Sequence, residues 1–508
     1  MQRTGRFSLV LISASVALSI VLSSCTNNTD GLKSARNTKQ EPQGIEQKRQ
    51  TVLAALTQRV HKEDLQNKNQ SIAELPAPER KPNSAFDPDV RPLLEPGFTA
   101  TPSELDQPTR LASAAEPKKP SVQNRRSAIK TGNVATNLRG LSRFQAKLAA
   151  LKSGQRSKPV TILHIGDSHV ASDSFSRGIR RSLQAEFGNA GRGAVIPANA
   201  YKYGVADNVS LKASGSWYAK TALRSKSGPY GLSGAQVSSR SSRASMTMTA
   251  KDGPFDWAEA TVVTGPSQGA FDLVVGKTKK RFDAWSKNKG SKTFRLEIEG
   301  NTVKLSPAGG GRTSVLSWAT GKNQPGIRYV NFGLIGATVN VTKRFDSTLM
   351  ANDIRQLDPD LIVYGYGTNE GFNDRLDLKS YAKIARRFVG KLKSAAPNAD
   401  VVYIGAASGL RRKARGGRTC GRGWWEPRRL NPLRTTMKNL AKKTGAAYWD
   451  WSKAMGGPCA VNRWAKWGMA AKDRIHLTSK GYEQSSQKFA NWLMTHQHSG
   501  LELALKTQ

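Results

Sequence analysis

The stretch 159–173, PVTILHIGDSHVASD, decides the fold of this chain. Its first half is a short run of mostly apolar residues, which is typical of a buried strand. The run ends at Gly166, and Asp167 and Ser168 follow at once. A glycine permits a tight turn, and an aspartate can accept hydrogen bonds from the N–H groups of that turn. We therefore expect Ser168 to lie on the turn that leaves a buried strand.

Strands and helices alternate along much of the remaining chain. Strands that alternate with helices of this length predict a parallel sheet with helices on both faces, and hence a three-layer α/β fold. The expected strands are 160–165, 327–332, 361–366, 401–404 and 446–449. The expected helices are 141–151, 175–187, 350–357, 378–395, 433–444 and 479–495.

Residues 205–325 interrupt this alternation. They are rich in Ser, Thr, Gly and Lys, and short β-like runs such as FDLVVG and TFRLEIEG are separated by turn residues. This pattern predicts an inserted β-sandwich-like domain. The α/β domain would then be built from two parts of the chain, 136–204 and 326–508.

The N-terminus has the features of an export signal. Arg3 and Arg6 precede an apolar run over 8–22, which is shorter than the roughly 20 residues of a membrane span and leads into LSSC at 22–25. LSSC resembles a bacterial lipobox, so residues 1–25 are predicted to be a lipoprotein signal peptide with Cys25 lipidated. An uncleaved anchor helix is the alternative. Thr26 and Asn27 follow in place of an aspartate, which favours the outer membrane of a Gram-negative bacterium and the periplasm.

Residues 26–135 are predicted to be a disordered, proline-rich linker. Ten of the 23 prolines fall between Pro76 and Pro120, among Gln, Asn, Ser, Lys and Glu. Such a composition buries too little apolar surface to offset the entropy lost on ordering. The linker would tether the folded domains to the membrane.

Positive charge is concentrated in the part of the chain that is expected to fold. The net charge is +42, and from Thr131 onward there are 60 Lys and Arg against 24 Asp and Glu. Such an excess predicts an anionic partner: nucleic acid, a membrane surface or an acidic polymer. Export and the lack of an aromatic–basic recognition motif argue against nucleic acid.

Two cysteines remain once Cys25 is set aside. An even pair in an exported chain predicts one disulfide, between Cys420 and Cys459, with two unrelated buried thiols as the alternative. Two tryptophans lie close to the first cysteine in CGRGWWEPRR, 420–429. They could line a glycan groove or pack around the disulfide.

Three polar segments follow expected strands or precede the last helix. In an open parallel sheet, functional residues gather at the carboxyl ends of the strands. Besides Ser168, these segments carry Asn369 in YGTNEGFN, 366–373, and Asp473 and His476 in AKDRIHLTSKGYE, 471–483. Acyl transfer requires a nucleophile, a base and a group that orients the base. Ser168, His476 and Asp473 are the candidates for these three catalytic roles.

Acyl transfer also requires hydrogen-bond donors for the oxyanion. The N–H of Ser168 and the side-chain amide of Asn369 are two candidates. A glycine N–H from another loop would be the third, most plausibly Gly336 in NFGLIGATVN, 331–340, with Gly333 as the alternative.

These segments, in this order, resemble the four blocks of the SGNH/GDSL hydrolases. The segments HIGDSHVASDSFS, FGNAGRGAVIPA, YGTNEGFN and AKDRIHLTSKGYEQ most resemble bacterial peptidoglycan O-acetylesterases. The resemblance implies a serine esterase with a flavodoxin-like parallel sheet. It also implies a carbohydrate-binding-module-like insertion between the first and second blocks. Glu370 departs from the common G-x-N-D of the third block, and its role is open.

No metal or organic cofactor is expected. His164 and His169 flank the nucleophile, but two histidines without a sensible third ligand do not predict a metal site. We interpret Asp167 as structural and His169 as a neighbour of the serine that is not its base.

The leading hypothesis is a lipid-anchored periplasmic serine esterase that removes O-acetyl groups from peptidoglycan through an acetyl-serine. The alternatives are an acetyltransferase, an esterase acting on another acetylated polysaccharide, and a non-catalytic wall-binding lipoprotein. The oligomeric state and the identity of the acetylated hydroxyl do not follow from the sequence.

Overall fold

A computed structural model describes residues 138–201, 206–412, 416–421 and 423–494. All of these belong to the second of the two units into which the chain divides, Ser84–Gln508. The predicted signal peptide, Cys25 and the linker over 26–135 lie outside the described residues. No helix in the described part of the chain is long and apolar enough to span a membrane.

A five-stranded parallel sheet forms the centre of the α/β domain. Its strand order is β13-β1-β14-β15-β19, so the first strand in sequence lies between the second and the third. This is the flavodoxin-like order, and the predicted fold class is confirmed. The strands are β1 (Val160–Gly166), β13 (Ile327–Gly333), β14 (Leu361–Gly365), β15 (Asp400–Gly405) and β19 (Ala447–Asp450).

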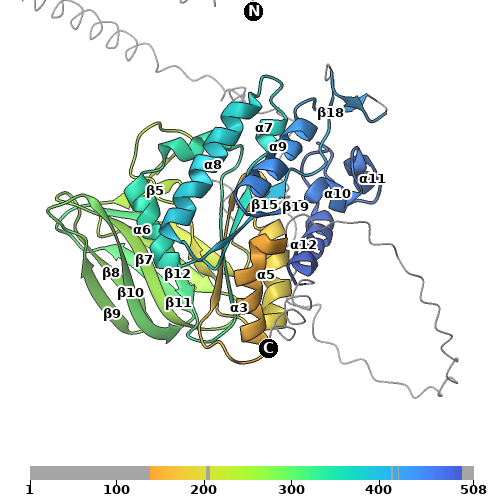
Figure 1. Ribbon diagram of the computed structural model, residues 1–508. Helices are drawn as coiled ribbons and strands as arrows, with labels where there is room; N and C mark the ends of the chain where they lie inside the picture. The colour runs from red at the N-terminus through yellow and green to blue at the C-terminus, as the bar shows by residue number, and fades with distance from the viewer. Residues whose placement is uncertain (1–137, 202–205, 413–415, 422, 495–508) are drawn as a thin grey trace, which may run out of the picture. The chain divides into compact units, whose positions relative to one another are not determined.

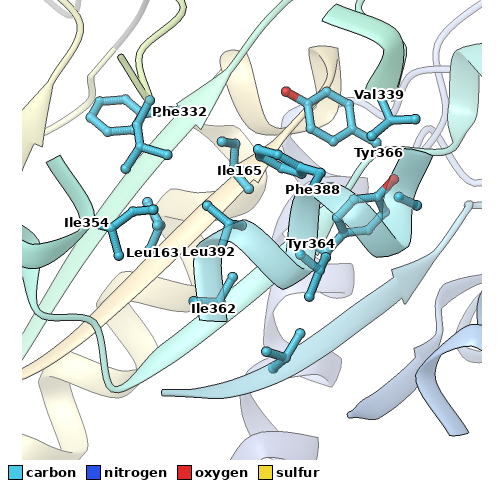
Figure 2. Close-up of a cluster of buried hydrophobic side chains, with 14 of the residues drawn as sticks. Leu163, Ile165, Phe332, Val339, Ile354, Ile362, Tyr364, Tyr366, Phe388 and Leu392 are labelled. Carbon is cyan, nitrogen blue, oxygen red and sulfur yellow. The ribbon is translucent and has the colours of Figure 1, made fainter. Parts of the chain in front are cut away.

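Helices cover both faces of this sheet because successive strand residues alternate between the faces. Leu163 and Ile165 of β1 pack under one helical layer, whereas Val160 and Ile162 pack under the other. The first layer contains α6 (Ser347–Leu357), α8 (Leu378–Ala395) and α9 (Leu430–Lys443). The second contains α3 (Ser142–Lys152), α5 (Ser174–Phe187) and α12 (Ser479–Met494). Figure 2 shows the first core, where Ile354 of α6 and Leu392 of α8 lie over Leu163 and Ile362.

The inserted region forms two antiparallel sheets that enclose a core of their own. One sheet has the order β10-β7-β12-β5-β4 and the other β3-β6-β11-β8-β9. Side chains from both, such as Val262 and Leu273, share one apolar cluster, so the region is a β-sandwich (Figure 1). Its strands are β3 (Val209–Ser214), β4 (Tyr218–Thr221), β5 (Ala235–Ser239), β6 (Ser245–Ala250), β7 (Phe255–Thr264), β8 (Ala270–Val275), β9 (Thr278–Asp283), β10 (Gly290–Gly300), β11 (Thr302–Pro307) and β12 (Thr313–Gly321).

The chain begins to pair with the sandwich earlier than residue 205. Strand β2 (Gly193–Val195) lies antiparallel to β12, with Val195 opposite Trp318. The sandwich also packs on the α/β domain directly, because Trp257 belongs to the same apolar cluster as Val330 and Ile354. The two parts are therefore joined by a shared core and a shared sheet.

The remaining elements are short. They are the 3₁₀ helices η2 (Leu138–Leu141) and η3 (Val339–Arg344), the helices α4 (Ser168–Ala171), α7 (Thr368–Gly371), α10 (Trp451–Met455) and α11 (Ala460–Lys466), and the strands β16 (Arg411–Arg412), β17 (Arg418–Thr419) and β18 (Trp424–Glu426). A disulfide joins Cys420, beside β17, to Cys459, which precedes α11.

We predict that Gly333→Ala lowers the free energy of unfolding by about 1–3 kcal/mol. A Cβ at residue 333 would lie 2.1 Å from the backbone nitrogen of Ala171, so α4 and β13 would have to separate. Equilibrium unfolding in urea measures the change. Gly390→Ala on α8 is the control, since its Cβ meets nothing within 4 Å and should stabilise the helix by about 0.5–1 kcal/mol. Equal stability of the two variants would contradict this account of Gly333.

Candidate active site

The end of β1 places Ser168 at the start of a short helix. A Cβ on Gly166 would lie 2.6 Å from the carbonyl oxygen of Gly365 on β14, so only glycine fits between these strands. Asp167 then caps α4 by accepting a hydrogen bond from the N–H of His169 at 3.1 Å. The N–H of Ser168 has no partner among the described residues. It is available to an oxyanion.

Ser168, His476 and Asp473 form a continuous hydrogen-bonded chain. The Oγ of Ser168 lies 2.9 Å from Nε2 of His476, and Nδ1 of His476 lies 2.7 Å from Oδ2 of Asp473. Ser168 and His476 are 308 residues apart in sequence, and the fold brings them together. With Nδ1 protonated towards Asp473, Nε2 is free to accept the serine proton.

The Asp473 carboxylate is held by the backbone of its own turn. Oδ1 accepts hydrogen bonds from the N–H groups of Ile475 at 2.9 Å and His476 at 3.0 Å, and the intervening Arg474 has a φ of 60°. Burial alone would raise the pKa of Asp473. The hydrogen bonds and charge of His476, with the two backbone N–H groups, outweigh burial and hold the pKa below its usual value. Asp473 is therefore ionised when it orients the imidazole.

Gly336 and Asn369 form the opposite side of the site. Gly336 has a φ of 73° in a turn closed by a hydrogen bond from Ala337 N–H to Leu334 C=O, and its own N–H has no partner among the described residues. Nδ2 of Asn369 donates to the carbonyl oxygen of Ala337 at 2.8 Å, which fixes the amide beside that turn. The second N–H of the amide has no acceptor among the described residues and remains available.

Gly333, the alternative donor, has a different task. It is the last residue of β13 and lies against α4, as its close approach to Ala171 shows. The next residue, Leu334, donates its N–H to the carbonyl oxygen of Gly166 at 3.0 Å. Gly333 thus lets β13 and α4 approach, whereas Gly336 presents a free N–H in the turn that follows.

Glu370, whose role the sequence leaves open, ties the third block to the second. It is 2% exposed, and its Oε1 accepts a hydrogen bond from the N–H of Val339 at 2.6 Å. Val339 begins η3, two residues beyond Ala337, so Glu370 and Asn369 hold neighbouring points of one loop. Burial raises the pKa of Glu370 to about 8 despite this hydrogen bond, so the acid is largely protonated at neutral pH.

Asp167 connects the first block to the third. Its Oδ2 accepts a hydrogen bond from the N–H of Thr368 at 3.3 Å while Oδ1 caps α4. Burial raises its pKa to about 6, even though these hydrogen bonds favour the ionised form. The side chain is fully buried, so it braces the turn and has no direct access to a substrate.

The two histidines that flank the serine in sequence are buried. His169 Nδ1 lies 2.9 Å from the hydroxyl of Tyr482, and His164 Nδ1 lies 2.9 Å from that of Tyr329. Burial lowers the pKa of each imidazole to about 3, so both are neutral. No group of three or more potential metal ligands occurs in the described part of the chain.

Tyr482 is a supporting residue that the sequence reasoning missed. It is buried in α12, and its hydroxyl holds His169, whose ring lies 5.4 Å from the ring of His476. In the sequence, Tyr482 lies in GYE, 481–483, at the end of the segment that carries Asp473 and His476.

Of the two tryptophans near Cys420, Trp424 has a packing role. The guanidinium groups of Arg412 and Arg474 lie 4.9 and 5.5 Å from the centroid of its ring. Arg474 belongs to the catalytic turn, so Trp424 of β18 contacts that turn through this guanidinium group.

A cavity of about 200 Å³ lies beside these loops. Ala171 at the end of α4 and Ile335 beside Gly336 line one side, and the segment after β2, including Pro197 and Tyr201, lines the other. Arg192 and Asn331, which hydrogen-bond to each other at 2.6 Å, supply polar atoms. The cavity thus adjoins the loops that carry Ser168 and Gly336, although neither residue lines it.

Comparisons with known proteins agree with this geometry. Residues 301–484 match the model of the GDSL-like lipase/acylhydrolase family. A solved structure described as a peptidoglycan O-acetylesterase in action is similar over 72% of this chain and 99% of its own, with 26% identity and a TM-score of 0.63. The chain is a serine esterase of the SGNH/GDSL type.

Other esterases align less extensively. An acetyl xylan esterase matches at 18% identity over 33% of this chain and 80% of its own, with a TM-score of 0.26. A carbohydrate acetylesterase from Sinorhizobium meliloti matches at 15% identity over 33% of this chain and 79% of its own, with a TM-score of 0.25. A comparison with curated proteins finds no match.

We predict that the length and hydrogen bonding of Glu370 matter to the esterase more than its charge. Glu370→Gln keeps an acceptor for the Val339 N–H and should retain kcat within about threefold. Glu370→Asp is one methylene shorter and should lower kcat by about tenfold or more, because the oxyanion turn loses its support. Hydrolysis of 4-nitrophenyl acetate measures both. Glu370→Asp at wild-type activity would contradict the positioning role.

The raised pKa of Glu370 predicts a pH effect on stability. The native state keeps its proton up to about pH 8, whereas the unfolded chain releases it near the ordinary value of 4.5. The stabilisation of the native state by protonated Glu370 is therefore fully present below pH 4.5 and is lost as the pH rises through about 8. Between these two values the free energy of unfolding falls by about 1.4 kcal/mol per pH unit. Relative to Glu370→Gln, the wild type should lose stability from pH 5 to pH 8 in urea unfolding. Parallel curves for the two proteins would refute this.

Proposed function

We propose that this esterase removes O-acetyl groups from peptidoglycan through an acetyl-Ser168 intermediate. The observation that carries the proposal is the hydrogen-bonded chain Ser168–His476–Asp473. The loops of the donors Gly336 and Asn369 are hydrogen-bonded to the turn that carries Ser168. The similarity to the peptidoglycan O-acetylesterase structure, which extends over 99% of that chain, supports the substrate class.

The chemistry follows from the geometry. Oγ of Ser168 attacks the acetyl carbonyl while Nε2 of His476 takes its proton, and the ionised Asp473 stabilises the resulting imidazolium. The N–H groups of Ser168 and Gly336 and the amide of Asn369 stabilise the oxyanion. When the C–O bond breaks, His476 returns the proton to the sugar hydroxyl. Water, deprotonated by His476, then releases acetate and restores the serine.

Two features favour a polymer over a small ester. The cavity beside Ala171 and Ile335 can receive the ring that carries the acetyl group. The excess of 60 Lys and Arg over 24 Asp and Glu from Thr131 onward favours a substrate with carboxylates, such as the stem peptides of peptidoglycan.

Acetate release from O-acetylated peptidoglycan tests this proposal. Ser168→Ala should lower the rate by at least about a thousandfold, and Asp473→Asn by a similar factor, with unchanged thermal melting temperatures. Equal release by Ser168→Ala and wild type would overturn the mechanism. Transfer of acetyl to glycan oligomers in place of acetate release would favour the acetyltransferase alternative.

We further propose that the mature protein is anchored through lipidated Cys25 in the periplasm. The support is the order of Arg3, Arg6, the apolar run over 8–22 and LSSC at 22–25. Several acyl chains on one cysteine would give a durable anchor, since each buried CH₂ contributes roughly 0.8 kcal/mol. Labelled palmitate should be incorporated into the wild type and not into Cys25→Ser, and labelling of both would contradict the assignment.

A further inference from the structure

An uncompensated basic groove lies between η3 and α8, outside the catalytic residues. It has a volume of about 510 Å³. Its lining includes four cations, Lys343, Lys383, Arg387 and Lys391, and no acidic residue. All four side chains belong to exposed residues. We call this feature the α8 groove.

The like charges on α8 destabilise this helix. Lys379, Lys383, Arg387 and Lys391 follow one another at intervals of four residues, so they form one row on the helix surface. Each successive like-charge pair destabilises a helix by about 0.2–0.5 kcal/mol. The whole helix, LKSYAKIARRFVGKLKSA, has six basic residues and no acidic one. A row of this kind is stabilised when an anion binds along it.

The neighbouring elements do not neutralise the row. Within the described chain, none of the four groove cations takes part in a salt bridge. Lys391 instead donates to the hydroxyl of Ser347 at the start of α6. The acids Asp346 and Asp377 cap the N-termini of α6 and α8 by accepting backbone N–H groups. Asp353 of α6 is buried and accepts the N–H of Leu232. The positive charge of the groove is therefore open to an external partner.

The shape of the groove favours an extended partner. The row from Lys379 to Lys391 spans about 18 Å along the helix axis. Phe388 and the half-buried Ile384 form an apolar floor, and the hydroxyl residues Ser380 and Thr342 lie among the cations. This combination fits a strand that carries carboxylates and also has apolar faces, as a glycan with peptide substituents does.

The groove is also connected to the catalytic loops. Val339, at the start of η3, is held by Glu370, and Lys343 follows within the same 3₁₀ helix. On the other wall, α8 follows α7, which carries Asn369 and Glu370. Both walls of the groove thus continue directly into the loops that form the oxyanion side of the site.

We propose that the α8 groove binds the stem-peptide carboxylates of the polymer whose acetyl groups reach Ser168. This proposal rests on peptidoglycan being the substrate. The groove holds the strand through several charge-assisted contacts, and it acts on binding of the polymer without taking part in the reaction at Ser168.

Cosedimentation with insoluble peptidoglycan tests the proposal. The variant Lys383→Gln/Arg387→Gln should bind sacculi at least about fivefold more weakly than wild type, with a smaller dependence on salt. Its kcat/KM for 4-nitrophenyl acetate should be unchanged. Lys466→Gln/Lys488→Gln, which removes the same charge from exposed positions on α11 and α12, is the matched control and should bind like wild type.

A second arm identifies the ligand chemistry. Sacculi whose carboxylates have been converted to amides should bind wild type as weakly as intact sacculi bind the groove variant. Equal binding of intact sacculi by the groove variant and wild type would overturn the proposal, as would undiminished binding of amidated sacculi. Binding to phosphatidylglycerol vesicles is measured in parallel. If the groove variant loses binding only to these vesicles and not to sacculi, the proposal is overturned in favour of a membrane surface. Binding to sacculi does not require an acetyl group. Failure of acetate release would therefore count against the proposed function and leave the result for the α8 groove distinguishable.

Discussion

The site depends on the close approach of three strand ends at the point where the order of the sheet reverses. Gly166 of β1 lies against Gly365 of β14 with no room for a side chain, and Gly333 of β13 lies still closer to α4. These contacts bring the loops after β13, β1 and β14 within hydrogen-bonding distance. The bonds from Leu334 to Gly166, from Thr368 to Asp167 and from Asn369 to Ala337 then fix the loops together. Nucleophile and oxyanion donors are positioned by the same network.

Asp473 and Glu370 have different protonation states in the site, and these suit them to different roles. Asp473 is kept ionised by His476 and two backbone N–H groups, and it can stabilise an imidazolium. Burial raises the pKa of Glu370 to about 8 despite its hydrogen bonds to backbone N–H groups such as that of Val339, so Glu370 serves as a neutral brace. The neighbouring imidazoles of His164 and His169 are kept neutral by burial. The catalytic imidazole is the one that an ionised carboxylate can reach.

Much of this fold can be predicted because its signals are local. Helix α8 has the predicted limits, since its periodicity is strong and Asp377 caps its first turn. Helix α9 begins at Leu430, three residues before the predicted start, because Pro432 is tolerated in a first turn where its missing N–H is not needed. The helices α4 and α7 were not predicted, since four residues are too few to show a period. The short strands β16, β17 and β18 were not predicted for the same reason.

Some residues of the candidate site could also be predicted from local sequence, and others could not. Ser168, Asn369, Asp473 and His476 could be proposed from short motifs, and the structure brings them together. The partner of Glu370 could not be predicted, because Val339 is 31 residues away and its N–H is reached only through the fold. Tyr482 behind His169 and Trp424 against Arg474 are likewise products of tertiary packing.

The central claim is that Ser168 carries the acetyl group during turnover. Rapid acid quenching of the esterase mixed with excess 4-nitrophenyl acetate, followed by peptide mass spectrometry, measures this directly. The account predicts the mass of one acetyl group on Ser168 in the wild type and its absence in Ser168→Ala. An acetyl group on another residue of an active wild type, or acetate release by Ser168→Ala at the wild-type rate, would contradict the account.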